Sequence, residues 1–133
     1  MRKALFWLPS ALVVAVIIYA TLFPDPAGAD ELPDIPGIDK LIHAIMFGGM
    51  AGALAFDYCR SHRLTRPSRQ TILTCCAVSL VFGGIIELLQ GAMALGRGAD
   101  WFDFLADGVG TAVAFFTAPP TIERVLSEHK KGD

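Results

Sequence analysis

Four long apolar segments dominate the chain, and each approaches the ~20 helical residues that cross a bilayer core. They cover about residues 4–23, 38–57, 71–95 and 101–118. Pro119-Pro120 follows the fourth segment, where proline is expected to end a helix. Only 18% of the residues are charged, which is below the ~25% of soluble domains. The sequence therefore predicts an all-α integral membrane four-helix bundle within residues 1–120, followed by a cytoplasmic polar tail over 121–133.

The charges of the connecting loops predict how the bundle is oriented. Loop 24–37 carries acidic residues and no basic residue, whereas loop 57–70 carries Arg60, Arg63, Arg66 and Arg69. Because cytoplasmic loops of membrane proteins are enriched in lysine and arginine, loop 57–70 and both termini should be cytoplasmic. Loops 24–37 and 96–100 should then lie outside. Cys59 falls within the expected cytoplasmic loop.

A cleaved signal peptide is the competing interpretation of residues 1–29. Met1-Arg2-Lys3 precedes the apolar run, and Ala27-Gly28-Ala29 resembles a small-residue cleavage site. The apolar run of about 20 residues is longer than the 7–15 residues of a signal peptide, which favours a retained helix. Cleavage would leave three helices and would not change the orientation of the second.

Polar residues gather at the expected outer ends of the second, third and fourth segments. An ionisable side chain at the centre of a membrane helix costs roughly 2.5–3.5 kcal/mol on insertion scales, so such residues usually have a function. The candidate ligand-binding set is Asp39, Lys40, His43, Glu87, Gln90, Arg97, Asp100, Asp103 and Asp107. We expect these residues to share one site that opens to the outer side, with the first helix more peripheral.

Spacing along each helix supports this grouping. Asp39 and His43 are four residues apart and share a helix face, and Asp100, Asp103 and Asp107 fall within one sector of the fourth helix. Glu87 lies ~24 Å along the third helix, where a carboxylate needs a partner or a proton. Gly48 and Gly52 form a G-x-x-x-G pattern on another face of the second helix, which is typical of close helix packing.

The set carries two bases against five acids, a formal charge of −3 with His43 neutral. A site without water cannot hold this charge, because burying unpaired carboxylates costs too much free energy. The site should therefore contain water, be partly protonated or hold a cation. The candidates for holding a divalent metal are His43, Glu87, Asp103 and Asp107. Structural roles remain open for single residues: a helix cap for Asp39 or Asp100, and an ion pair with Lys40 or Arg97 for Glu87.

Taken in order, these motifs resemble the VanZ-like family of small bacterial membrane proteins. The motifs are Asp39-Lys40-x-x-His43, Glu87-x-x-Gln90 and Arg97-x-x-Asp100-x-x-Asp103-x-x-x-Asp107-x-x-Gly110, and the match spans roughly residues 5–117. The family usually has Asn at the position of Asp107, so this chain adds a negative charge. The resemblance implies a multi-pass protein of the bacterial inner membrane and an association with resistance to the glycopeptide teicoplanin. It implies no established reaction.

Three functions remain open from the sequence. The first is a site that binds the polar head of an amphiphile, either a cell-envelope lipid or a lipoglycopeptide, with Lys40 and Arg97 contacting its anionic groups. The second is an intramembrane, metal-dependent enzyme that modifies a lipid-linked cell-envelope precursor, although no H-E-x-x-H, G-x-S-x-G or P-loop motif is present. The third is a structural polar knot, in which the polar residues hold the helices together and bind no ligand. The few basic residues argue against nucleic acid as a partner.

Overall fold

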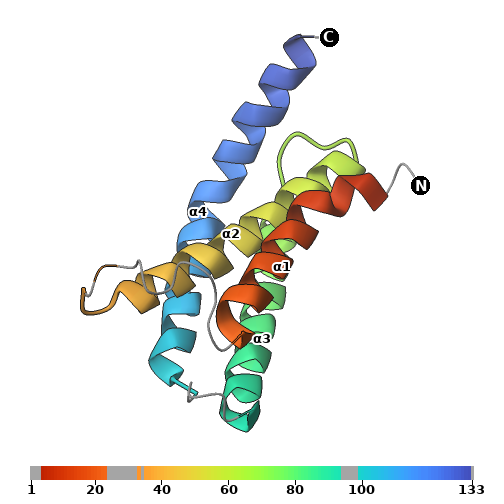
Figure 1. The fold of residues 1–133 in the computed structure, drawn as a ribbon. Coiled ribbons are helices and arrows are strands. Elements are labelled where there is room, and N and C mark those ends of the chain that lie inside the picture. Colours follow the sequence, from red (N-terminus) through yellow and green to blue (C-terminus); the bar gives the residue numbers. More distant parts are fainter. Residues whose placement is uncertain (1–3, 24–32, 34, 94–98, 133) are drawn as a thin grey trace.

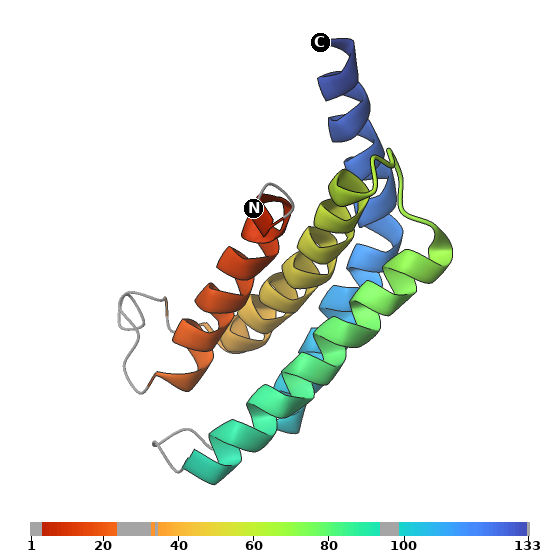
Figure 2. The ribbon, with the colours of Figure 1, turned by 90° about the vertical axis from the view of Figure 1, so that its right-hand side faces the viewer.

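The computed structural model describes residues 4–23, 33, 35–93 and 99–132. They form a short 3-10 helix, η1 (Ala4–Trp7), and the helices α1 (Leu8–Leu22), α2 (Ile38–Ser61), α3 (Arg69–Met93) and α4 (Trp101–Lys131). Successive helices alternate in direction, as Figures 1 and 2 show. The described part of the chain contains no β-strand, which confirms the all-α prediction.

Three stretches of helix are long and apolar enough to cross a membrane. They are Ala4–Leu22, Ile38–Ser61 and Arg69–Met93. By length and composition, this finding supports the predicted membrane protein with transmembrane helices. Helix α4 carries Asp103 and Asp107 in its first turns. That α4 also crosses the membrane stays a prediction, as do the four-helix membrane bundle and the cytoplasmic termini.

Helices α2 and α4 pack closely at a pair of glycines. A Cβ atom added to Gly48 would lie 2.6 Å from the carbonyl oxygen of Gly110, and one added to Gly110 would collide with the backbone of Ala44. Small residues of this kind let helix backbones approach each other. The packing role predicted for the G-x-x-x-G face is therefore confirmed at Gly48, whereas a Cβ at Gly52 would only touch Ala118.

Helix α1 packs on α2 and α3, and among the described residues it makes no contact with α4 (Figure 2). Its Ile17 is fully buried in an apolar cluster with Phe47 and Ile86. Because α1 contacts α2 and α3 but not α4, the expectation that the first helix is more peripheral is confirmed.

A buried carboxylate ties α1 to the far end of α2, and the sequence analysis did not single it out. Asp57 is fully buried in α2, and its Oδ2 accepts hydrogen bonds from the backbone nitrogen and the hydroxyl of Ser10 at 2.9 and 2.6 Å. The Arg60 guanidinium lies 3.9 Å from Asp57 Oδ1 and 5.3 Å from the ring centres of Phe6 and Phe56. Loss of residues 1–29 would strand this carboxylate, so the contacts favour a retained first helix.

The expected end of the fourth helix at residue 118 is wrong. Helix α4 continues through Pro119-Pro120 to Lys131, so the described part of the 121–133 tail is helical. Proline removes a backbone donor and disfavours a helix interior, but packing compensates here. Pro119 and Ile122 are buried, and Glu123 forms an ion pair of 2.7 Å with Arg66 in the loop before α3. Helix α2 likewise runs to Ser61, so Cys59 lies in a helix and is fully buried.

The alternation of the helices yields a test of sidedness that does not depend on the buried native cysteines. Ala99 and Lys131 are both exposed and lie at opposite ends of α4. A cysteine at Ala99 should react with an impermeant thiol reagent in intact cells, because residue 99 is predicted to be outside. A cysteine at Lys131 should react only after lysis. Labelling of the Lys131→Cys variant in intact cells would contradict the predicted topology.

Candidate functional site

Seven of the nine predicted site residues meet where the start of α2, the end of α3 and the start of α4 come together. This outer cluster consists of Asp39, Lys40, His43, Glu87, Asp100, Asp103 and Asp107. Arg97 lies outside the described residues, and Gln90 belongs to a different contact. The convergence of three helices that the sequence predicts is therefore observed for the residues that the structure describes.

Lys40 forms the exposed rim of the outer cluster. Its Nζ lies 3.0 Å from Asp39 Oδ2, and it lies 3.3 Å from both Asp100 Oδ2 and Asp103 Oδ1. The side chains of Lys40 and Asp39 are 38% and 56% exposed, so their direct attraction contributes little stability. Lys40, Asp39 and Asp100 therefore form the solvent-accessible part of the outer cluster.

The two helix-cap hypotheses have opposite outcomes. Asp100 caps α4, because its Oδ1 accepts a hydrogen bond from the backbone nitrogen of Phe102 at 2.9 Å. The cap role for Asp39 is wrong: Gly37 occupies the cap position of α2, with a positive φ of 83° that glycine adopts without strain. Asp39 instead lies in the first turn and contacts Lys40.

His43 is held in a fixed orientation deeper in the outer cluster. Its Nδ1 lies 3.0 Å from Oδ1 of the fully buried Asp107, and its ring stacks on Phe47 with 5.9 Å between ring centres. Its Nε2 points to the other side, 3.6 Å from Asp103 Oδ2. With Nδ1–H donating to an ionised Asp107, Nε2 is the atom that can bind a metal or accept a proton.

Two buried carboxylate oxygens in the outer cluster have no hydrogen-bond partner among the described residues. Glu87 is fully buried and accepts a hydrogen bond from the Asp100 backbone nitrogen through Oε2 at 2.9 Å, but its Oε1 has no partner. Asp107 Oδ2 also has no hydrogen-bond partner among the described residues. Lys40 forms its ion pairs with Asp39, Asp100 and Asp103, so the predicted Glu87–Lys40 pair is not formed. Buried oxygens without partners are costly unless they carry a proton or bind a water or an ion.

The donor atoms of the outer cluster are close enough to share an ion. His43, Glu87 and Asp103 each offer one atom within 4.8 Å of the others, as do Asp39, Asp100 and Asp103. Metal–ligand distances of ~2.0–2.6 Å separate opposed ligands by ~4–5 Å, so the first of these groups fits a divalent cation. Asp107 is not in that group, and its contact with His43 makes it an orienting residue.

The electrostatics of the outer cluster also favour a cation. Among the described residues of the cluster, five acids face one lysine, which gives a formal charge of −4 with His43 neutral. Even if His43 is protonated, the cluster remains strongly negative. A cation or a cationic group would offset this charge, whereas an anion alone could approach only at Lys40.

The hydrogen bond that Gln90 forms is not to the outer cluster, and its role in ligand binding stays a prediction. Its Nε2 donates a hydrogen bond to the carbonyl oxygen of Thr21 at 2.8 Å, near the end of α1. Three residues separate Gln90 from Glu87, which rotates its side chain by about 60° around α3 toward α1. Gln90 therefore positions the first helix.

Gly83 makes room for the Asp107 carboxylate, and sequence reasoning missed it. A Cβ at this position would lie 2.6 Å from Asp107 Oδ2 and 3.3 Å from Phe47 Cε1. The signal was available, because Gly83 precedes Glu87 by four residues and so shares its helix face.

Comparison of the chain with protein-family models, with curated proteins and with solved structures found no match in any of the three. The resemblance to the VanZ-like family therefore stays a prediction from the ordered motifs.

Two neighbouring glycines on α3 test the geometry around Asp107. Gly83→Ala should lower the thermal stability of the purified protein by about 1–3 kcal/mol, because the added methyl group overlaps the Asp107 carboxylate. Gly84→Ala is the matched control, since its Cβ would make an ordinary 3.5 Å contact with Phe104. Thermal unfolding followed by circular dichroism measures both. Equal stability of the two variants would contradict the placement of Asp107.

Proposed function

We propose that the chain is a multi-pass protein of the bacterial inner membrane whose outer cluster binds the polar head group of an amphiphile through a bound cation. One observation carries the proposal. Two buried carboxylate oxygens around His43, Glu87 Oε1 and Asp107 Oδ2, have no hydrogen-bond partner in the described part of the chain. Asp57 Oδ1 also has none, but the Arg60 guanidinium lies 3.9 Å from it. Oxygens like those of Glu87 and Asp107 are expected where a ligand completes the site.

The surroundings of the outer cluster support an amphiphile over a soluble ligand. Large apolar side chains follow the polar ones on each contributing helix: Leu41 is 55% exposed, Leu88 63% and Leu105 61%. In a membrane these side chains face lipid, so the cluster adjoins a surface that acyl chains occupy. A molecule with a polar head and apolar tails satisfies both environments at once.

The donor atoms indicate which chemical groups would bind. His43 Nε2 and the carboxylates of Glu87 and Asp103 suit a divalent cation such as Mg²⁺, Mn²⁺ or Zn²⁺. Lys40 at the exposed rim suits a phosphate or carboxylate of the head group. A cation and an ammonium side by side would together hold an anionic head that the acids alone would repel.

A second candidate function is an intramembrane enzyme that acts on the same class of amphiphile. The contact that favours it is the 3.0 Å approach of His43 Nδ1 to Asp107, which leaves Nε2 directed toward Asp103. A histidine oriented by a buried carboxylate is a common arrangement for general-base catalysis. The resemblance to the VanZ-like family fits either function and suggests a lipid-linked cell-envelope precursor or a lipoglycopeptide as the ligand.

Metal titration of the purified protein tests the proposal. After treatment with a chelator, the protein should bind one divalent cation, as measured by calorimetry with Mg²⁺, Mn²⁺ and Zn²⁺. Glu87→Gln and His43→Ala should abolish binding, and Asp107→Asn should weaken it by about 10–100-fold, as loss of an orienting contact does.

Glu128→Gln supplies the matched control, because Glu128 is exposed on α4 and lies outside the outer cluster. This variant should bind the cation as the unmodified chain does. The absence of binding to the unmodified chain, or equal binding to the Glu87→Gln variant, would contradict a cation in the outer cluster.

A further inference from the structure

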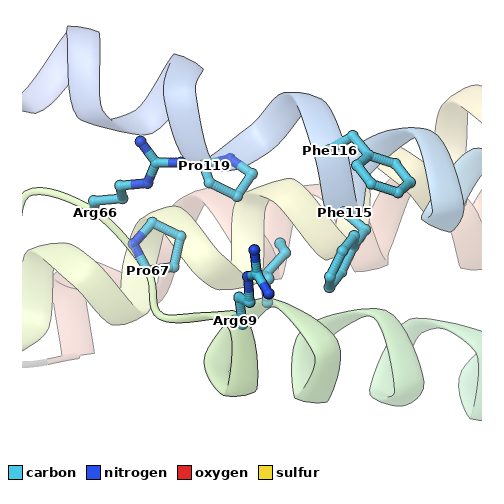
Figure 3. A pocket seen from close by; sticks show the side chains of 7 residues that line it. Arg66, Pro67, Arg69, Phe115, Phe116 and Pro119 are labelled. Carbon is cyan, nitrogen blue, oxygen red and sulfur yellow. The ribbon is translucent and has the colours of Figure 1, made fainter.

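A pocket lies at the end of the helices opposite to the outer cluster, between the start of α3 and the middle of α4. It has a volume of about 370 Å³. Arg66, Pro67 and Arg69 line one end, and Phe115 and Phe116 line the other, with Pro119 facing Pro67 across it, as Figure 3 shows. The pocket uses no residue of the outer cluster, so it can be considered independently of the function proposed above.

The charged end of the pocket is positive. Among the described residues Arg69 forms no ion pair, and Arg66 binds Glu123 through NH1 at 2.7 Å. Because a guanidinium carries five N–H donors, Arg66 retains donors for a further partner. Arg63 lies in the same loop as Arg66, between α2 and α3. Arg60 lies in the last turn of α2, where Asp57 and two aromatic rings occupy it. Two guanidinium groups are thus available beside a single carboxylate, that of Glu123.

The other end of the pocket is apolar and open to the surface of the helices. Ile72 is almost fully buried at its base, whereas the Phe116 side chain is 75% exposed. Phe116 lies about one turn before Pro119 on α4, on the membrane side of the arginines. A ligand that fills this pocket therefore needs an anionic group at one end and an apolar chain at the other.

We propose that this pocket binds an anionic glycerophospholipid of the cytoplasmic leaflet. Its phosphate would contact Arg66 and Arg69, because guanidinium groups match the oxygens of a phosphate with paired hydrogen bonds. Its acyl chain would lie against Phe116 and the apolar surface of α4. Basic pockets between membrane helices on the cytoplasmic side are a known kind of site for anionic lipid heads. The loop charges that predict this side to be cytoplasmic include the same arginines.

Native mass spectrometry of the full chain tests the site with two lipids of equal chain length. Dioleoyl phosphatidylglycerol should bind more tightly than dioleoyl phosphatidylcholine, by about fivefold for each contacting arginine. Arg69→Gln should reduce the preference for phosphatidylglycerol by about fivefold. Arg63→Gln is the matched control, since Arg63 is also exposed, lies in the loop before α3 and does not line the pocket. This variant should leave the preference unchanged.

Phe116→Ala and a soluble head-group analogue separate a lipid from a free phosphate. Phe116 is exposed, so its replacement should leave the fold intact while weakening the binding of both lipids. Glycerol phosphate should bind far more weakly than phosphatidylglycerol. The proposal is overturned by equal losses in Arg63→Gln and Arg69→Gln, which would indicate diffuse charge attraction. It is also overturned by tight binding of glycerol phosphate alone, or by no preference for phosphatidylglycerol.

Discussion

The outer cluster depends on the close approach of α2 and α4 where Gly48 meets Gly110. A single methyl group at either position would push the two backbones apart. His43 lies just over one turn before Gly48, and Asp107 lies just under one turn before Gly110, so this contact sets the 3.0 Å separation between their side chains. A glycine on a third helix, Gly83, then gives the Asp107 carboxylate its space. Backbone packing thus comes first, and the polar geometry follows from it.

The two ends of the protein treat buried carboxylates differently. Asp57 accepts two hydrogen bonds from Ser10 and lies near the Arg60 guanidinium, and this network joins α1 to α2. Asp57, Glu87 and Asp107 each keep one oxygen without a hydrogen-bond partner among the described residues. Asp57 Oδ1 lies 3.9 Å from the Arg60 guanidinium, whereas Glu87 and Asp107 lie among other acids. A buried carboxylate beside a guanidinium is compensated within the fold, whereas one among other acids costs free energy that a bound cation can recover. The comparison separates a structural contact from a candidate binding site within one short chain.

Much of this arrangement could be predicted from the sequence, because its physical causes are local. The lengths of the apolar runs predict the helices, and the three- and four-residue spacings place Asp103 and Asp107 on one face. The departures from expectation arise where tertiary contacts decide. Pro119-Pro120 remains helical because Ile122 packs in the core, and Gln90 faces Thr21 because α1 lies beside it. Asp57 was overlooked because it lies at the end of an apolar run, where a charge is expected. Its partner Ser10 is also 47 residues away, so no local pattern indicates the contact.

The unfolding free energy of the Glu87→Gln variant, measured in detergent, is the most direct test of the claim that the outer cluster is a binding site. Glutamine keeps an oxygen for the Asp100 backbone nitrogen and removes a negative charge from the cluster, so stability should be unchanged or higher. Asp57→Asn serves as the internal comparison, and it should lose stability because its carboxylate is already partnered by Ser10 and Arg60. If Glu87→Gln instead loses about 3–5 kcal/mol, as a broken structural ion pair does, the outer cluster is scaffold and the account is contradicted.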